Sequence, residues 1–100
     1  MTLKIWQIKD SSPNNRYMGW RYINGKPNPD EYDLVWEDNI EYTGLEQIFT
    51  VFNLHHPEDY RGRSLSVSDI VEVHDNPNIE DGFWFCDIIG WRKVTDFRKE

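Results

Sequence analysis

The sequence predicts a small α+β domain, built as a curved antiparallel sheet of five or six strands with one main helix. Three features of its 100 residues indicate this fold class. Alanine, the best helix former, is absent. The apolar residues are mainly β-branched or aromatic, which suits the pleated surface of a sheet. A single segment has the apolar spacing of an amphipathic helix. A chain of this length has room for one domain, residues 1–100.

The first part of the chain predicts three strands. Apolar and aromatic residues place them at residues 3–9, 17–23 and 32–36. Turn-forming residues at 10–15 separate the first two strands. Asn24-Gly25 is a turn dipeptide, but the prolines at 27 and 29 forbid an immediate ladder, so a wide loop is expected before the third strand.

The main helix is expected at about residues 44–53. Thr43 and Glu46 have the spacing of a capping box at its start. An apolar stripe at i, i+3, i+4 and i+7 should face the sheet, and it comprises Leu45, Ile48, Phe49 and Phe52. Pro57, followed by two acids, predicts a short helical turn at about 57–60.

The last third of the chain is again predicted as β-structure. Leu65 and Val67 alternate with serines, and strands are expected at 70–74, 83–89 and 91–95. Gly90 is interpreted as a bend or bulge between the last two. The expected order is therefore β-β-β-α-β-β-β.

Charge is distributed unevenly along the chain. Residues 27–60 contain no Lys or Arg, although the whole chain has 11, and they contain nine of its 18 acids: Asp30, Glu31, Asp33, Glu37, Asp38, Glu41, Glu46, Glu58 and Asp59. This acidic middle has two interpretations, a solvated face that keeps the protein soluble or a docking face for a basic partner. A DNA-like array of carboxylates is a third possibility, and it would need regular rows of acids on one side.

Three groups of residues invite a catalytic or metal-binding interpretation, and each has a structural alternative. His55 and His56 lie near Glu58 and Asp59, but adjacent histidines do not converge easily on one ion. Cys86 lies in an apolar strand, where a cysteine is usually a small buried hydrophobe. The serines at 64, 66 and 68 lack a nucleophile elbow, and Ser68 and Asp69 are expected to accept backbone amides in a turn. We therefore expect no enzyme activity, no cofactor and no metal.

Two sequence segments resemble the YodL-like domain family. Residues 53–62 read NLHHPEDYRG, and residues 64–71 read SLSVSDIV. Two further segments, YDLVW at 32–36 and WFCDIIGW at 84–91, are similar to strands of that family, although Cys86 and Trp91 depart from its usual Val and Phe. The resemblance implies a domain of Gram-positive bacteria and their mobile elements, found in long proteins beside anti-restriction modules. It implies no particular reaction, because the family has none established.

The function expected from these observations is a non-enzymatic accessory or regulatory protein-interaction module of a bacterial or mobile genetic element. One alternative is an acidic, DNA-mimicking inhibitor of a DNA-binding enzyme. Another is an uncharacterised enzyme that uses residues 55–69. A basic protein partner is expected to contact four residues of the 55–69 segment and the neighbouring acids: His55, Asp59, Arg61 and Arg63.

Arg61 is the expected hot spot of this contact, and its alternative role is an internal clamp that bonds Asp59 or a loop carbonyl. Arg61 and Arg63 are otherwise expected to pair with Glu58, Asp59 or the acidic middle. The pI of about 4.8 argues against direct nucleic-acid binding. No segment predicts a membrane span or signal peptide, so we expect a cytoplasmic monomer with no membrane contact.

Overall fold

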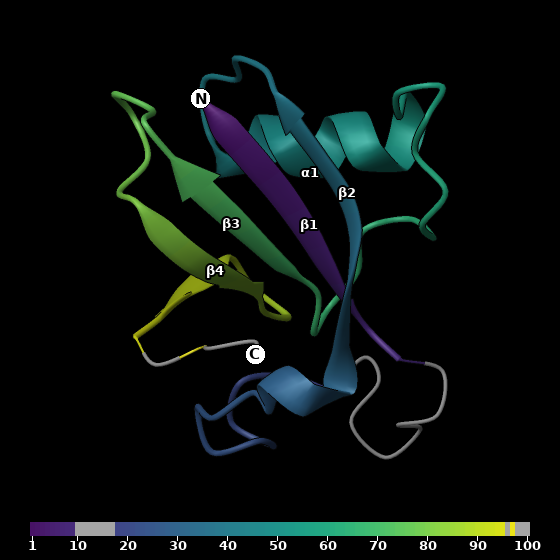
Figure 1. Cartoon of the computed structure of the whole chain (residues 1–100). Coiled ribbons are helices and arrows are strands. Elements are labelled where there is room, and N and C mark those ends of the chain that lie inside the picture. Colours follow the sequence, from purple (N-terminus) through teal and green to yellow (C-terminus); the bar gives the residue numbers. More distant parts are fainter. Residues whose placement is uncertain (10–17, 96, 98–100) are drawn as a thin grey trace.

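The computed structural model describes residues 1–9, 18–95 and 97 (Figure 1). Its elements, in chain order, are β1 (Thr2–Ile8), a 3-10 helix (Pro29–Glu31), β2 (Tyr32–Asn39), α1 (Leu45–Leu54), β3 (Ile70–His74), β4 (Gly82–Cys86) and β5 (Trp91–Val94). The fold is α+β with one α-helix, as the sequence predicts. No helix among these residues is long and apolar enough to cross a bilayer.

The five strands form one antiparallel sheet in the order β2-β1-β3-β4-β5. β1 and β3 lie at the centre and are buried over most of their length. β2 and β5 are the outer strands, at opposite edges. The pairing of β1 with β2 shifts register after Ile5, where β2 contains the extra residue Val35. Such a bulge twists the edge strand locally and changes where its side chains point.

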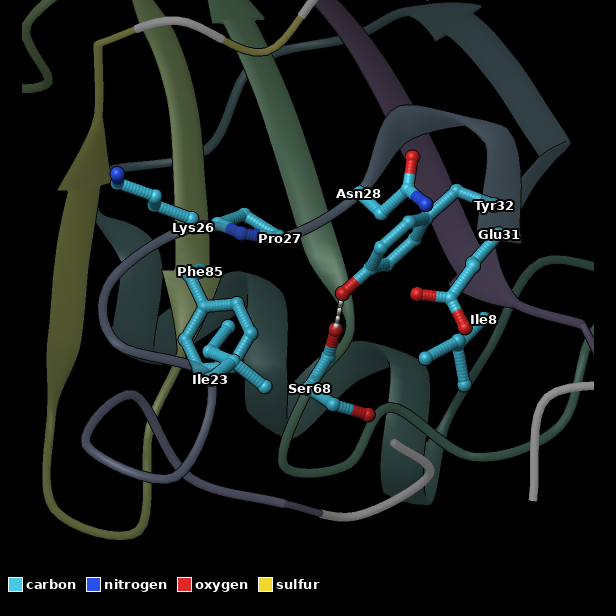
Figure 2. Close-up of a pocket in the computed structure, with 9 residues that line it drawn as sticks. All are labelled: Ile8, Ile23, Lys26, Pro27, Asn28, Glu31, Tyr32, Ser68 and Phe85. Atoms are coloured by element: carbon cyan, nitrogen blue, oxygen red, sulfur yellow. Dashed lines mark hydrogen bonds between the residues drawn. The ribbon is translucent and has the colours of Figure 1, made fainter. Parts of the chain in front are cut away.

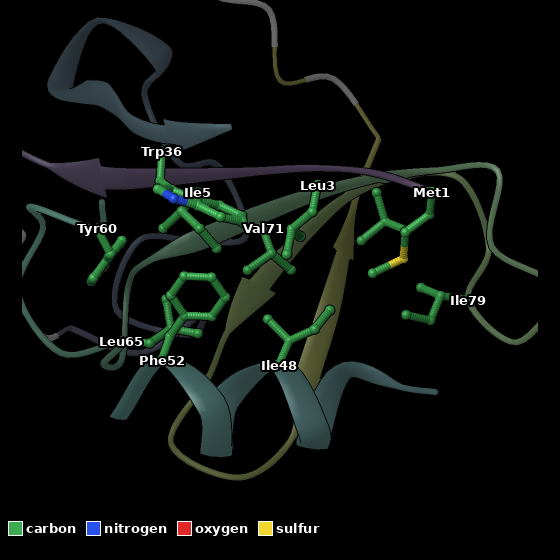
Figure 3. Close-up of a cluster of buried hydrophobic side chains, with 11 residues drawn as sticks. Met1, Leu3, Ile5, Trp36, Ile48, Phe52, Tyr60, Leu65, Val71 and Ile79 are labelled. Atoms are coloured by element: carbon green, nitrogen blue, oxygen red, sulfur yellow. The ribbon is translucent and has the colours of Figure 1, made fainter. Parts of the chain in front are cut away.

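The larger hydrophobic core lies between the sheet and α1 (Figure 3). Ile48 and Phe52 point from the helix toward Leu3, Ile5 and Val71 on the strands, and all five side chains are fully buried. The helix therefore forms where its apolar stripe meets the centre of the sheet, as the i, i+3, i+4 spacing predicts. The remaining two stripe residues, Leu45 and Phe49, pack against the same cluster and are half-buried.

A second, smaller core covers part of the opposite face of the sheet. Ile70 and Phe85 are its fully buried members, and Tyr32 and Phe97 pack there edge to face with ring centroids 5.3 Å apart. Successive residues of β3 thus serve different cores, since Ile70 belongs to this one and Val71 to the helix side. β3 is buried at four consecutive positions, Ile70 to Val73, because cores lie on both of its faces, whereas burial in β1 alternates from Thr2 to Trp6.

Two predicted strands differ from the structure. The segment expected as a strand at 17–23 falls partly outside the described residues, and its described part forms turns over residues 20–25. The hydrogen bond from the amide of Gly25 to the carbonyl of Trp20 (2.9 Å) closes these turns. The strand expected at 83–89 ends at Cys86. Residues 87–90 form a turn instead, because the amide of Asp87 donates to the carbonyl of Gly90 (3.0 Å).

The start of α1 also differs from the predicted capping box. Gly44 is the N-cap residue and has no side chain to accept a hydrogen bond. The side-chain oxygen of Gln47 accepts from both the amide and the hydroxyl of Thr43, at 2.7 and 3.0 Å. Gln47 therefore takes the reciprocal role that the spacing assigned to Glu46. Glu46 instead accepts from the indole nitrogen of Trp91 (3.0 Å).

We predict that Phe52→Ala lowers the free energy of unfolding by about 3–5 kcal/mol, because it removes a fully buried ring and leaves a cavity. Phe49→Ala should cost less, about 1–2 kcal/mol, since this ring is only half-buried. Leu54→Ala is the control, because Leu54 is 69% exposed at the end of the same helix. Urea titration measures all three, and equal losses for Phe52 and Leu54 would contradict this core assignment.

Candidate functional site

The segment from His55 to Asp69 connects α1 to β3 and is fixed to the body of the domain at several points. Tyr60 and Leu65 are buried at 3% and 2% exposure, and Ser68 and Asp69 are buried as completely. Leu54, immediately before the segment, is exposed. The predicted helical turn at 57–60 is a single turn closed by the amide of Tyr60 and the carbonyl of Pro57 (3.0 Å).

The carboxylate of Asp69 organises the second half of this segment. It has no solvent exposure, and it accepts hydrogen bonds from the Arg63 guanidinium (2.9 Å), the Gln7 amide (3.1 Å) and the backbone amide of Ser66 (2.8 Å). Burial raises the pKa of Asp69 to about 6, and the Arg63 charge and these hydrogen bonds oppose that rise. The sequence correctly predicted that Asp69 accepts a backbone amide. Its pairing with Arg63 replaces the predicted pairing of Arg63 with upstream acids.

Gln7 was missed by the sequence interpretation and is a central residue of this network. It lies in β1 at 4% exposure, and its side-chain amide donates to the carbonyl of Arg63 (2.9 Å) as well as to Asp69. Its oxygen accepts from the amide of Arg63 (3.1 Å). The sequence signal was the position of Gln7, which is in phase with the apolar residues Leu3 and Ile5 on the same face of this strand. Such a side chain must find partners when it is buried.

Gly62 allows the segment to approach β1 this closely. A Cβ atom at this position would lie 2.6 Å from the Gln7 side-chain oxygen and 2.7 Å from the Tyr60 hydroxyl. Those distances are far shorter than any real carbon contact, so a larger residue would push the segment away from the network. The position between Arg61 and Arg63 therefore requires glycine for steric reasons.

Two buried tyrosines hold the backbone of the segment through their hydroxyl groups. Tyr60 donates to the carbonyl of Arg63 and Tyr32 to the carbonyl of Ser68, both at 2.6 Å. Burial raises the pKa of Tyr60 to about 12 and raises that of Tyr32 further. Both phenols therefore remain protonated hydrogen-bond donors at neutral pH. Ser68, held in this way, has a positive φ of 83° immediately before Asp69.

The structure places the four predicted partner-binding residues in one segment but in different environments. His55 is exposed and caps the end of α1, where its amide donates to the carbonyl of Val51 (2.8 Å). Asp59 is exposed and accepts from the Trp36 indole (3.1 Å). Arg61 is exposed, and its guanidinium donates to the carbonyl of Glu58 (2.5 Å) rather than to a carboxylate. Arg63 is mostly covered by its contact with Asp69.

The hydrogen bond between Trp36 and Asp59 brings this segment next to the edge strand β2. Figure 1 shows the segment on the β2 side of the sheet. Exposed carboxylates from both parts lie along this edge of the domain, and we refer to them together as the acidic surface: Asp33, Glu37, Asp38, Glu58 and Asp59. Lys9 and Lys4 lie near two of them, with nitrogen–oxygen distances of 4.0 Å to Asp33 and 3.8 Å to Glu37. Such long, exposed pairs neutralise little charge.

Cys86 and His56, two of the residues that suggested catalysis or metal binding, have structural contacts. Cys86 is buried, and burial, followed by nearby carboxylates, raises the pKa of its thiol to about 12, so the thiol is protonated at neutral pH. His56 has a ring nitrogen 3.2 Å from the carbonyl of Pro57, and its ring tilts over Tyr60 with centroids 5.5 Å apart. Within residues 1–9, 18–95 and 97, no three His, Cys, Asp or Glu side chains are grouped to hold a metal ion.

A pocket of about 250 Å³ lies beyond the end of the segment, on the face opposite α1 (Figure 2). The Tyr32 hydroxyl meets the Ser68 carbonyl at its wall, while Lys26 and Glu31 lie on opposite sides of it. Ile8, Ile23 and Phe85 contribute apolar side chains to the wall, and Pro27 and Asn28 complete it. The polar groups do not converge on one point, so the pocket lacks a paired acid and base.

The fold and the site define a small α+β domain whose long connecting segment is fixed against the sheet by a buried polar network. The family model of the YodL-like domain matches residues 2–97, nearly the whole chain. The chain belongs to this family. Comparisons with curated proteins and with solved structures returned no match.

We predict that the Asp69 carboxyl group titrates near pH 6, about two units above its ordinary value of 3.8. Carbon-13 NMR of the carboxyl group measures this midpoint directly. Because the folded protein binds this proton more tightly than the unfolded chain, the contribution of Asp69 to stability is fully present below pH 4. It is lost as the pH rises to about 6, by roughly 1.4 kcal/mol for each unit between the two pKa values.

Asp69→Asn is the matched control for this titration, since it keeps an oxygen that can accept from Ser66 and removes the ionisable group. Its unfolding free energy should lack this component of the pH dependence. A wild-type midpoint near 4 would show that Arg63 and the hydrogen bonds outweigh burial.

Proposed function

We propose that this protein is a non-enzymatic interaction module that binds a basic partner protein through the acidic surface and the neighbouring residues 55–63. The observation that carries the proposal is the meeting of two features at one edge of the domain. Exposed carboxylates of β2 lie beside a long segment whose shape is fixed by buried contacts. A long loop that is ordered by its own anchors is commonly functional.

The fixed shape of the segment favours binding. Tyr60 and Asp69 hold its backbone from inside, so its outward side chains are presented without further ordering. A preorganised surface loses little conformational entropy when a partner binds, and more of the contact energy appears as affinity. Arg61 uses one nitrogen of its guanidinium group for internal carbonyls and is otherwise exposed. It is therefore able to contact a partner while still bracing the turn.

The charge of the acidic surface favours a basic partner. Glu58 has no side-chain partner among the described residues, and Glu37 and Asp33 have only the distant lysines. A surface of this kind attracts basic proteins over distances of about 10 Å at moderate salt and disfavours acidic ones. Lys4 and Lys9 interrupt the carboxylates of β2. This mixture of charges fits a protein-docking face better than the uniform rows that a DNA mimic needs.

The absence of enzyme activity is part of the proposal and rests on the same internal bonds. The polar groups of the 55–69 segment, Asp69, Arg63 and the Tyr60 hydroxyl, bond to one another or to backbone, so the groups best able to do chemistry have structural roles. Membership of the YodL-like family supports an accessory or regulatory role in a bacterial or mobile genetic element. We further propose that the protein acts as a monomer in the cytoplasm.

We predict that neutralising the acidic surface weakens capture of the partner. The variant Glu37→Gln/Asp38→Asn/Glu58→Gln changes exposed side chains only. Affinity capture from a lysate of the natural host, read by mass spectrometry, should recover a basic protein with the wild type and about tenfold less with this variant, because three exposed contacts together contribute roughly 1.4 kcal/mol. The recovery should also fall as salt is raised.

The matched control is Asp75→Asn/Glu80→Gln/Asp81→Asn, which makes the same change in charge on the connection between β3 and β4. It should leave recovery unchanged. Equal losses of recovery in both variants would show that the partner responds to the net charge of the protein and not to the acidic surface. Displacement of DNA from the captured protein would favour the DNA-mimic function instead.

We predict that Arg61→Ala weakens binding to the captured protein while shifting the melting temperature by less than about 4 °C, because an exposed hydrogen bond to a carbonyl contributes under about 1 kcal/mol. Thermal unfolding and binding are measured on the same preparation, with Arg61→Lys as the charge-conserving comparison. A large fall in melting temperature with unchanged affinity would make Arg61 a structural brace only.

A further inference from the structure

The connection between β4 and β5 exposes two large apolar side chains at its tip. Ile88 is 73% exposed and Ile89 is 88% exposed. Tyr22, from the turns at residues 20–25, is 62% exposed and lines the same shallow hollow as the two isoleucines. These three are the most exposed of the large apolar residues in the described part of the chain, apart from Leu54. Side chains of this kind in one patch commonly mark a binding surface.

The sequence of this turn is unusual for its conformation. Asp87 and Gly90 are ordinary turn residues, and Gly90 has the positive φ (74°) that favours glycine. The two positions between them are ordinarily Asn, Asp, Gly or Ser, which solvate well and suit tight turns. Isoleucine is β-branched and gains stability by being buried, yet neither side chain is buried here. The fold itself thus supplies no reason for two isoleucines at this tip.

The patch is rigidly built. The Asp87 carboxylate accepts from the amides of Trp20 (3.0 Å) and Ile88 (2.8 Å) and from the Arg92 guanidinium (3.0 Å). These bonds join the turns at 20–25 to the β4–β5 connection. Glycine at position 19 lets the two segments approach closely. A Cβ atom there would lie 3.0 Å from both the Asp87 carboxylate and the Ile88 side chain. The apolar tip is therefore held in one position against its neighbours.

The hollow between these two segments has a volume of about 260 Å³ and a basic rim. Arg21 and Arg92 line it together with the apolar residues and the carboxylate of Asp87, which is already bonded to Arg92 and to two backbone amides. Arg21 has no charged partner within the described residues, and Arg92 uses its Nε for Asp87. In a chain with a net charge of −7, this is a local site where two guanidinium groups flank exposed apolar carbon. Arginine at such a rim pairs well with carboxylates.

We propose that this patch is a second docking surface, which binds a short acidic segment of a partner protein whose apolar side chain enters the hollow between Tyr22 and Ile88. The carboxylates of that segment would contact Arg21 and Arg92. The surface lies at the β5 edge of the sheet, opposite the acidic surface at β2, so it does not depend on the function proposed above. The hollow accommodates one or two side chains, which fits a short segment and is too little contact for a stable dimer.

The test uses a display library of random linear peptides, selected on the wild-type protein. Expected peptides carry a large apolar residue beside Asp or Glu. A resynthesised peptide should bind the Ile88→Asn/Ile89→Asn variant at least about tenfold more weakly, a loss of roughly 1.4 kcal/mol. Asparagine suits turns, so this variant should keep the fold. Arg21→Gln should also weaken binding and reduce its salt dependence.

Leu54→Asn is the matched control, because it replaces an exposed apolar residue on the far end of α1 and should leave peptide binding unchanged. Peptides that are basic, or that bind equally well without the isoleucines, would overturn the proposal. It would equally be overturned by failure to select any peptide. Two further results would assign the patch to another occupant: a dimer in sedimentation, or binding to phosphatidylcholine–phosphatidylserine vesicles, either of them lost in the Ile88→Asn/Ile89→Asn variant.

Discussion

The buried carboxylate of Asp69 is the interaction on which the other parts of this structure depend. It joins three regions that are distant in the sequence: β1 through Gln7, the connecting segment through Arg63 and Ser66, and β3, which begins at the next residue. The backbone of Asp69 also accepts from the amide of Cys86 (2.8 Å), which links the network to β4. A buried charge is costly unless it is paired and fully hydrogen-bonded. The segment can therefore take only conformations that keep these partners together.

This constraint explains how a domain of 100 residues can display a long, ordered segment. Its hydrophobic residues are divided between the two faces of one sheet, and neither core is large. Tyr60 and Leu65 anchor the segment to the helix-side core. The Asp69 network closes its other half by polar contacts instead. Residues 63–69 are thus held by the polar network together with the buried Leu65, whereas α1 is held mainly by apolar packing.

The two surfaces considered for binding lie at opposite edges of the sheet and have opposite character. The edge at β2 is acidic, and its neighbouring segment is polar. The connection leading into β5 is apolar with a basic rim. Because the two surfaces lie at opposite edges, a partner bound at one would not cover the other. The inner strands β1, β3 and β4 lie between the two edges and keep them apart.

The sequence by itself determined the elements whose local pattern and tertiary environment agree. The apolar stripe around Ile48 and Phe52 specified α1, and the run from Ile70 to His74 specified β3, because burial followed the spacing in both. The turn-forming residues also predicted correctly that the Asp69 side chain accepts a hydrogen bond from a backbone amide. The candidate segment could be identified from its residue types. Its internal bonds could not, since they depend on which distant groups meet.

Only the tertiary structure decided those segments in which contacts with distant residues override the local preference for a strand. The aromatic residues around Trp20 and Tyr22 suggest a strand, but this part of the chain turns to cover the second core and the β4–β5 connection. Ile88 and Ile89 suggest a longer strand, but Asp87 ends it by bonding Trp20 from another part of the chain. The burial of Gln7 beside Asp69 has the same origin. All three features depend on contacts with residues that are distant in the sequence. The spacing of residue types along the chain does not reveal such contacts.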